Sequence, residues 1–229
     1  WHDESGRADC LTAALRIGEL FLRTFYDGRR PITAMGFSEM NLGIYHGMAL
    51  LYERTGDERY LRFCHAAEQD MATAEAGDYL QHALAGKGVW QCPRPRWESL
   101  HTIMGFAPLY RATGDERYRQ ALVHTVRSIL RTDVHNTGAF STDEQAVGSP
   151  YRVGNIETCC VVAFDALCIE ALRLTGDVTL IDHLELSHRN AVLGCWSPSG
   201  RWCTYHTPMD GERYASWRDI AFQSRPGSP

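Results

Sequence analysis

The sequence has no excess of basic residues: 23 Lys and Arg stand against 28 Asp and Glu, which gives a formal net charge of −5. Nucleic acids and anionic membrane surfaces attract positively charged proteins, so we expect neither as a partner. No apolar stretch reaches about 18 residues, the length that would suggest a membrane-spanning helix. With 229 residues, 44% of them hydrophobic, the chain is instead expected to fold as one globular domain with a substantial core.

The short motifs of several large enzyme classes are also missing. The sequence contains no Gly-x-Ser-x-Gly turn, no glycine-rich phosphate loop, no His-Glu-x-x-His helix and no paired Cys-x-x-Cys ribbon. These patterns are typical of α/β-hydrolases, nucleotide-binding folds, zinc peptidases and structural zinc ribbons. The sequence therefore gives no support to any of these four classes.

The eight cysteines do not resemble a disulfide framework. Cys159 and Cys160 are adjacent, and adjacent cysteines rarely bond each other because the geometry is strained. We expect mostly reduced thiols, some of them available to a metal. Reduced thiols favour the cytoplasm, but the chain begins at Trp1 and is expected to lack its true N-terminus, so the localisation stays open.

The most regular feature of the chain is a repeated Thr-Gly-Asp sequence, at 55–57, 113–115 and 175–177. The glycine favours the left-handed conformation that ends a helix. The aspartate that follows accepts backbone N–H groups at the start of the next helix. Each copy therefore predicts a tight hairpin of two helices.

The spacing of apolar residues predicts helices on both sides of these turns. We expect an all-α fold, because repeated helical hairpins must stack on neighbours to bury their apolar faces in a curved array or closed ring. Residues 1–229 would form a single partial domain, truncated at both ends, in which 195–229 supplies short strands that lead toward a missing C-terminal part. The expected helices span residues 8–26, 39–54, 57–74, 98–112, 115–131, 157–174 and 177–194.

The main candidates for chemistry are Glu144 and the Glu-Thr-Cys-Cys stretch at 157–160. Glu144 lies on the long polar link 132–156, and long links inside a compact domain are usually functional. Two carboxylates on either side of one short connection suit glycoside hydrolysis, which needs an acid and a second group that attacks or activates water. A thiol at a helix start favours the thiolate, and zinc is bound by Cys, His, Asp and Glu. The alternatives are that Glu144 is solvated surface, and that Glu157 caps the helix while the thiols pack.

Two histidines are weaker candidates. His101 lies near the start of a predicted helix, and His46 lies in a Tyr-His-Gly sequence. In a helical ring one end of the inner helices opens onto a cavity, which would place both histidines near a ligand. A histidine on an apolar helix face is more often a hydrogen-bonded core residue, and this alternative stays open.

With these residues assembled, the chain resembles the β-L-arabinofuranosidase family, glycoside hydrolase family 127 and its relatives. Residues 138–144 are similar to the family's Gly-Gly-x-Ser-x-x-Glu loop, and 157–159 to its Glu-Thr-Cys motif. Residues 205–209 are similar to a Tyr-Val-Asn-Pro-Leu segment, and 101–102 to a His-Thr segment of the pocket. The Thr-Gly-Asp hairpins suit the family's (α/α)6 barrel.

The resemblance implies a retaining glycosidase that acts on terminal β-L-arabinofuranosides or a related furanoside, with an arabinose-containing glycan or oligosaccharide as its partner. Glu144 would be the general acid/base, and Glu157 and Cys159 would bind Zn2+. The segment 205–209 carries Thr207 where the family has Asn, which leaves the exact sugar open. Three residues are expected to bind the sugar: His46, His101 and Tyr205.

The family's nucleophile is one of two adjacent cysteines that complete the zinc site. The resemblance places that pair shortly beyond Pro229, so the fragment alone is expected to be inactive. Cys160 matches a small residue of the family and is not expected to be the nucleophile. Two other functions stay open: a non-catalytic carbohydrate-binding or interaction scaffold, and a sugar epimerase or unsaturated-glycoside hydrolase. The oligomeric state is not predicted.

Overall fold

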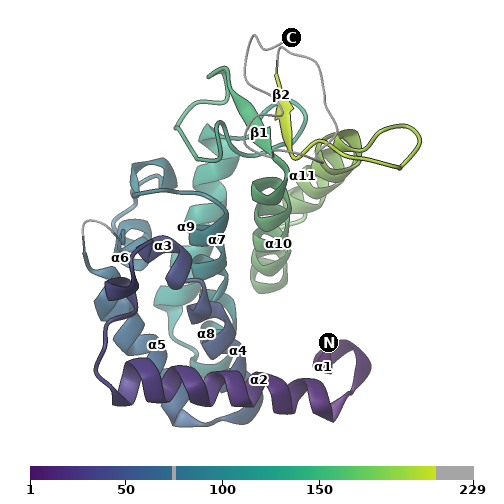
Figure 1. Ribbon diagram of the computed structural model, residues 1–229. Coiled ribbons are helices and arrows are strands. Elements are labelled where there is room, and N and C mark those ends of the chain that lie inside the picture. Colours follow the sequence, from purple (N-terminus) through teal and green to yellow (C-terminus); the bar gives the residue numbers. More distant parts are fainter. Residues whose placement is uncertain (74–75, 210–229) are drawn as a thin grey trace.

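The structure is a computed structural model that describes residues 1–73 and 76–209. It is mainly helical, with one small antiparallel sheet made of β1 (Asn155–Glu157) and β2 (His206–Pro208) (Figure 1). The predicted all-α class is therefore confirmed. Among the described helices, none combines the length and the apolar character needed to cross a membrane.

Most of the helices are joined by short connections, and the longest link lies between α9 and α10. The helices are α1 (His2–Ser5), α2 (Ala8–Phe21), α3 (Ser38–Asn41), α4 (Ile44–Thr55), α5 (Glu58–Met71), α6 (Tyr79–Leu84), α7 (Trp97–Met104), α8 (Phe106–Thr113), α9 (Glu116–Thr132), α10 (Thr158–Thr175) and α11 (Thr179–Ser187). Leu22–Asp27 and His188–Val192 continue α2 and α11 as π-helical turns, and Ile32–Met35, Val89–Gln91 and Leu193–Cys195 are 3-10 turns.

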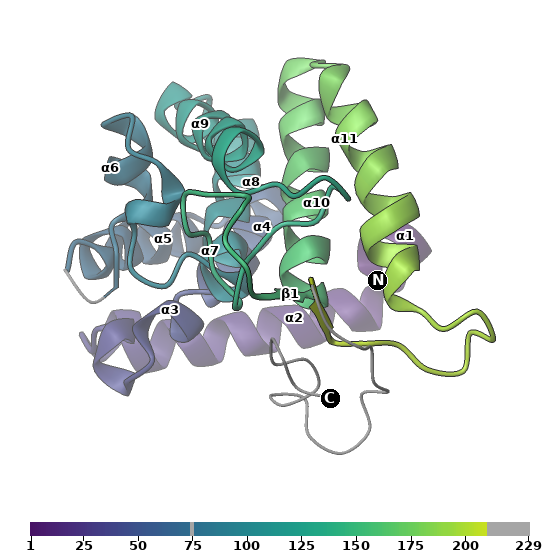
Figure 2. The same cartoon turned by 90° about the horizontal axis from the view of Figure 1, so that it is seen from above.

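Paired helices pack side by side into an arc of two rows (Figure 2). One row contains α4, then α7 with α8, then α10, and each of these packs on the next. The other row contains their hairpin partners α5, α9 and α11. Arg111 of α8 ties the first row together, because its guanidinium lies 2.5 Å from both Glu53 of α4 and Glu170 of α10. This arrangement is part of a helical toroid.

The three Thr-Gly-Asp turns have the predicted geometry. Gly56, Gly114 and Gly176 end their helices in the left-handed conformation, with φ of 69°, 72° and 68°. Asp57 and Asp115 then accept the backbone N–H of the residue two positions on, at 2.9 and 3.0 Å. A local sequence pattern thus fixes where each hairpin turns.

The core lies between the two rows of helices and contains large aromatic side chains. Tyr45 of α4 and Tyr118 of α9 are fully buried, and both hydroxyls donate to the same oxygen of Glu68 on α5 at 2.7 Å. A buried hydroxyl without a partner costs free energy. The shared acceptor therefore allows both tyrosine hydroxyls to be buried in the aromatic core without that cost.

Two predicted helices are each split in the structure. The helix expected over 98–112 breaks at Gly105, where an added Cβ would lie 2.5 Å from the ring of Tyr45. The break follows from Pro108, which has no N–H to donate to the carbonyl of Met104, and the close approach of α4 leaves room only for glycine at position 105. The helix expected over 39–54 is divided into α3 and α4.

The link 77–97, expected to be irregular, contains α6 and a 3-10 turn. Asp78 caps α6 by accepting the N–H of Gln81 at 3.0 Å, and α6 packs against α9. Its six residues are too few for the apolar spacing to predict it. In the region 195–229, where strands were expected, the described part contains β2 and a bridge between Trp196 and Cys203. Residues 210–229 lie outside the described residues.

Candidate active site

The pairing of β1 with β2 brings two distant parts of the chain together. Glu157, the last residue of β1, lies directly opposite His206, the first residue of β2. Directly opposed residues share one face of an antiparallel pair, so both side chains point the same way. Both residues are buried, at 7% and 5% exposure. This face of the sheet carries the candidate site.

Glu144 reaches the same place from the link 132–156. It lies in a tight turn in which Asp143 and Glu144 both have positive φ, 49° and 70°, a conformation uncommon for residues other than glycine. Asp143 holds the turn against β1, since its carboxylate accepts the N–H of Asn155 at 3.0 Å and its own N–H donates to the Asn155 carbonyl at 2.8 Å. As a result Glu144 Oε1 lies 3.1 Å from His206 Nε2.

The link that carries Glu144 rests on two buried polar residues. The ring nitrogens of His135 lie 2.9 Å from the carbonyl oxygens of Pro150 and Ser141. Asp133 accepts the N–H of Gly148 at 2.8 Å. Both residues belong to the segment that follows α9, so this segment fixes the position of the link that carries Glu144.

The two thiols at the start of α10 have different partners. Cys160 Sγ donates to Glu157 Oε2 at 2.8 Å, and Tyr205 Oη donates to Cys159 Sγ at 2.9 Å. The contact with Cys159, followed by burial and the charge of Glu157, raises the pKa of Cys160. Burial, followed by the contact with Cys159, raises the pKa of Tyr205. Although Glu157 is the N-cap residue of α10, its carboxylate caps no backbone N–H, so the capping role considered above is not found.

The donor atoms of this cluster suit a metal. A carboxylate oxygen of Glu157 and the sulfurs of Cys159 and Cys160 all lie within 4.8 Å of one another, and so do the donor atoms of Glu144, Glu157 and His206. A carboxylate with thiolates is a donor set that zinc accepts. The cluster therefore fits part of a zinc site.

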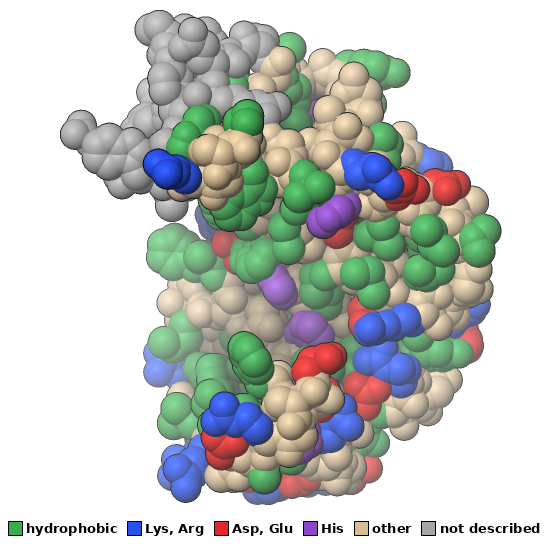
Figure 3. Space-filling model, turned by 90° about the vertical axis from the view of Figure 1, so that its right-hand side faces the viewer, with side chains coloured by type: hydrophobic (Ala, Val, Ile, Leu, Met, Phe, Trp, Pro, Cys, Tyr) green, Lys and Arg blue, Asp and Glu red, His purple; other side chains and the backbone are tan. Residues whose placement is uncertain are grey.

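The predicted histidines are not among the grouped donor residues of this cluster. His101 is on α7 and His46 on α4, and no hydrogen bond joins either one to Glu144 among the described residues. The ring of His101 packs on Trp97 at 4.2 Å, and its buried Nε2 has no hydrogen-bond partner in the described part of the chain. Burial lowers the pKa of His101, and burial followed by the nearby His101 lowers that of His46 to about 4. Figure 3 shows the side of the arc at the right of Figure 1, which is hollowed and carries histidines.

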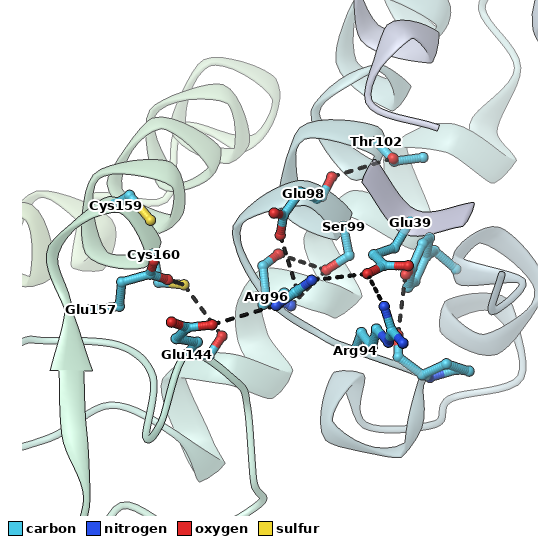
Figure 4. A network of polar contacts seen from close by, with 12 residues as sticks. Glu39, Arg94, Arg96, Glu98, Ser99, Thr102, Glu144, Glu157, Cys159 and Cys160 are labelled. Carbon is cyan, nitrogen blue, oxygen red and sulfur yellow. Dashed lines mark hydrogen bonds and ion pairs between the residues drawn. The ribbon is translucent and has the colours of Figure 1, made fainter. Parts of the chain in front are cut away.

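Sequence reasoning did not assign roles to several residues that surround Glu144. Arg96, directly before α7, lies 3.4 Å from Glu144 Oε2 and also contacts Glu39 and Glu98 (Figure 4). His206 lies within the segment 205–209, but no role was predicted for it. No local pattern identifies either residue, because the contacts span 48 and 62 positions.

Comparison with known proteins identifies the family. The sequence profile of the β-L-arabinofuranosidase, GH127 catalytic domain matches residues 1–226, which is nearly the whole chain. The chain belongs to glycoside hydrolase family 127. No curated relative matches its sequence.

Solved structures show the fold of this family 127 chain. A family 127 β-L-arabinofuranosidase from Geobacillus stearothermophilus aligns with 74% of the chain at 19% identity and a TM-score of 0.56. A β-arabinofuranosidase of family 127 aligns with 78% at 21% identity and a TM-score of 0.60. A structure described as a glycoside hydrolase aligns with 99% at 20% identity and a TM-score of 0.69. The aligned part spans 31%, 30% and 40% of these three longer chains, so the family 127 chain covers less than half of each.

Proposed function

We propose that the protein is a retaining glycoside hydrolase acting on terminal β-L-arabinofuranosides or a related furanoside. The observation that carries this proposal is the position of Glu144, whose carboxylate is held by His206 and Arg96 beside the two thiols at the start of α10. Family membership and structural neighbours that are described as arabinofuranosidases support it.

In this proposal Glu144 carries the proton in both steps. A cysteine thiolate attacks the anomeric carbon, the glycosidic C–O bond breaks, and the Glu144 carboxylic acid gives its proton to the leaving oxygen. In the second step the Glu144 carboxylate takes a proton from water, the water oxygen attacks the anomeric carbon, and the C–S bond breaks. The thiolate would come from the part of the longer protein that follows Pro229.

Glu157 and Cys159 would hold zinc together with two cysteines from outside residues 1–229. Zinc bound there would keep a cysteine ligand in the thiolate form near neutral pH. The geometry supports Cys159 and Glu157 as ligands because their donor atoms converge and the Glu157 carboxylate caps no helix N–H. Cys160 would support Glu157 through its hydrogen bond.

The sugar would be bound by Tyr205 and by the histidines of the inner helices. The buried Nε2 of His101 has no hydrogen-bond partner among the described residues, and a hydroxyl of the substrate would be a suitable one. Tyr205 faces Cys159 and so lies within the cluster. His46 is placed beside His101 and would line the same part of the cavity.

The proposal is tested with the full-length protein and two substrates, 4-nitrophenyl and methyl β-L-arabinofuranoside. Wild type should hydrolyse both, and Glu144→Gln should lower kcat/KM by about 100-fold or more on the methyl glycoside, whose leaving alcohol needs protonation. With Glu144→Ala and the nitrophenyl substrate, added azide should restore turnover and yield the arabinofuranosyl azide, because azide attacks without a general base. Wild-type activity retained in Glu144→Gln on both substrates would remove Glu144 from the mechanism.

A further inference from the structure

One guanidinium joins the turn that carries Glu144 to two helices at the opposite side of the site. Arg96 contacts three carboxylates: Glu39 of α3 at 2.9 Å, Glu98 of α7 at 3.1 Å and Glu144 at 3.4 Å (Figure 4). The side chain of Glu39 is only 3% exposed and that of Arg96 20% exposed. The pair of Arg96 with Glu39 is therefore screened by water much less than a surface pair, whereas the side chain of Glu144 is 39% exposed.

Arg96 is fixed without the help of Glu144. Its backbone N–H donates to Ser99 Oγ at 2.8 Å, and the Ser99 hydroxyl donates back to the Arg96 carbonyl at 2.7 Å. Ser99 is fully buried in α7, so the main chain of Arg96 is anchored to that helix. Burial acts to lower the pKa of Arg96, but Glu98, Glu39 and Glu144 raise it overall, so the guanidinium stays charged.

A second contact ties the two segments independently of any side chain. The N–H of Ala146, two residues after Glu144, donates to the carbonyl of Pro95 at 2.9 Å. The turn of Glu144 is therefore docked on the segment before α7 by a main-chain bond and an ion pair at neighbouring positions. The main-chain bond sets the distance between the segments, and the ion pair orients one carboxylate oxygen.

We propose that Arg96 is a positioning residue for Glu144. It holds Oε2 from the side of α7 while His206 holds Oε1 from β2, so that the carboxyl group keeps one orientation in a turn with an unfavourable backbone conformation. The inference rests on the proposed function, since Glu144 must be the proton carrier for its orientation to matter. Arg96 itself touches no reacting atom in this scheme.

The chain offers a matched control for this arginine. Arg94 binds the same Glu39 oxygen at 2.6 Å, closer than Arg96 does. Its side chain is 52% exposed, and it makes no contact with Glu144 among the described residues. Arg94→Gln and Arg96→Gln therefore each remove one partner of Glu39, but only the second removes a partner of Glu144.

The test uses the full-length protein with the methyl and 4-nitrophenyl β-L-arabinofuranosides. A misplaced acid costs most where the leaving group needs the proton, so Arg96→Gln should lower kcat/KM about 30-fold or more on the methyl glycoside. On the nitrophenyl glycoside, whose phenol leaves with little protonation, the loss should stay below about 5-fold. Arg94→Gln should lower kcat/KM by less than about 3-fold on both substrates. Arg96→Lys, which keeps the charge but not the planar fork, should fall between Arg96→Gln and wild type on the methyl glycoside.

The outcomes separate this inference from the function on which it rests. Wild type without activity, or Glu144→Gln without dependence on the leaving group, would remove the proposed function itself. If Glu144→Gln shows that dependence while Arg96→Gln behaves like Arg94→Gln, or loses both substrates equally, the positioning role is wrong. Thermal unfolding midpoints are recorded for each variant, and if Arg96→Gln does not fold, the same comparison is made with Arg96→Lys.

Discussion

At the start of α10, two adjacent cysteines lie in different environments. Cys159 accepts a hydrogen bond from Tyr205, whereas Cys160 is fully buried and donates to the Glu157 carboxylate. Consecutive side chains of a helix point about 100° apart around its axis, and here the two sulfurs meet different partners. The function proposed above gives the first of them to a metal, and the contacts of the second suit a supporting role.

Metal analysis of two single variants checks this difference. In full-length protein, Cys159→Ser is expected to lose the bound zinc, because a hydroxyl is a far poorer zinc ligand than a thiolate. Cys160→Ser is expected to retain it, since the serine hydroxyl can still donate to Glu157. Zinc per protomer is measured by atomic emission after dialysis against a weak chelator. Equal loss in both variants would make Cys160 a ligand as well.

At the scale of the elements, α10 and α11 share a buried acid. Asp165 of α10 accepts the hydroxyl of Ser187 at 3.0 Å, and its other oxygen lies 3.7 Å from Nε2 of His183 on α11. Burial raises the pKa of Asp165 to about 6 and lowers the pKa of His183. The folded state therefore prefers the neutral acid, and ionisation of Asp165 weakens the packing of these two helices.

The sign of the pH effect follows from this shift. Unfolded Asp has a pKa near 3.9, so between about pH 4 and pH 6 the folded state binds more protons, and stability falls as the pH rises through that window. Asp165→Asn keeps an acceptor for Ser187 and removes the charge. It should raise the free energy of unfolding by about 1 to 3 kcal/mol at pH 7.5 and by much less at pH 4.5. Urea unfolding at the two pH values measures it, and an equal effect at both would contradict the account.

A second prediction at this scale compares a glycine of a hairpin turn, Gly114, with a glycine inside a helix, Gly47. Gly114 has φ of 72° with nothing within 4 Å of an added Cβ, so Gly114→Ala suffers only backbone strain and should cost about 1 kcal/mol. Gly47 lies inside α4 with its nearest neighbour, Ile44, at 3.6 Å, so Gly47→Ala should gain about 0.5 to 1 kcal/mol. Thermal unfolding of the two variants should shift in opposite directions.

These elements also show how far the sequence could predict the fold. The Thr-Gly-Asp turns were predictable because their signal is local, with a left-handed glycine and a capping aspartate in adjacent positions. The break at Gly105 was missed although Pro108 is a local signal for it, whereas the contact of Gly105 with the ring of Tyr45, 60 positions earlier, is visible only in the structure. The helix α6 was missed because its six residues are too few to show the helical spacing of apolar residues.

The same limit applies to the candidate site. Glu144, Glu157 and Cys159 could be proposed because they stand in short motifs of a known family. Arg96 and His206 could not, because a charge or an imidazole gains its role from the carboxylate it meets, and nothing in the neighbouring sequence states which one that is. What the structure adds is the direction from which each oxygen of Glu144 is held.

At the scale of the whole molecule, the chain forms an arc that aligns with 30% to 40% of the length of the structures it resembles. One end of this arc is apolar: Ile17 of α2 and Leu50 of α4 are 53% and 38% exposed and border a shared groove. Faces of this kind are usually covered by a neighbouring element.

Residues 1–229 produced alone are expected to show no hydrolysis of 4-nitrophenyl β-L-arabinofuranoside under conditions in which the full-length protein is active. The reason is that the proposed mechanism takes its nucleophile and two zinc ligands from outside this segment. Circular dichroism confirms that the segment is helical before it is assayed. Activity in the segment that disappears in Glu144→Gln would mean that the nucleophile lies within it.

The pairing of β1 with β2 also bears on the order in which the parts of the molecule fold. Helical hairpins close over a few residues and form early, whereas the pairing of Glu157 with His206 closes a loop of 206 − 157 = 49 positions for only three residues of strand on each side. The sheet has little stability of its own and depends on helices that are already packed. During refolding the helical signal should therefore return before the activity does. The candidate site would therefore be the last part of the molecule to form during refolding and the first to open during unfolding.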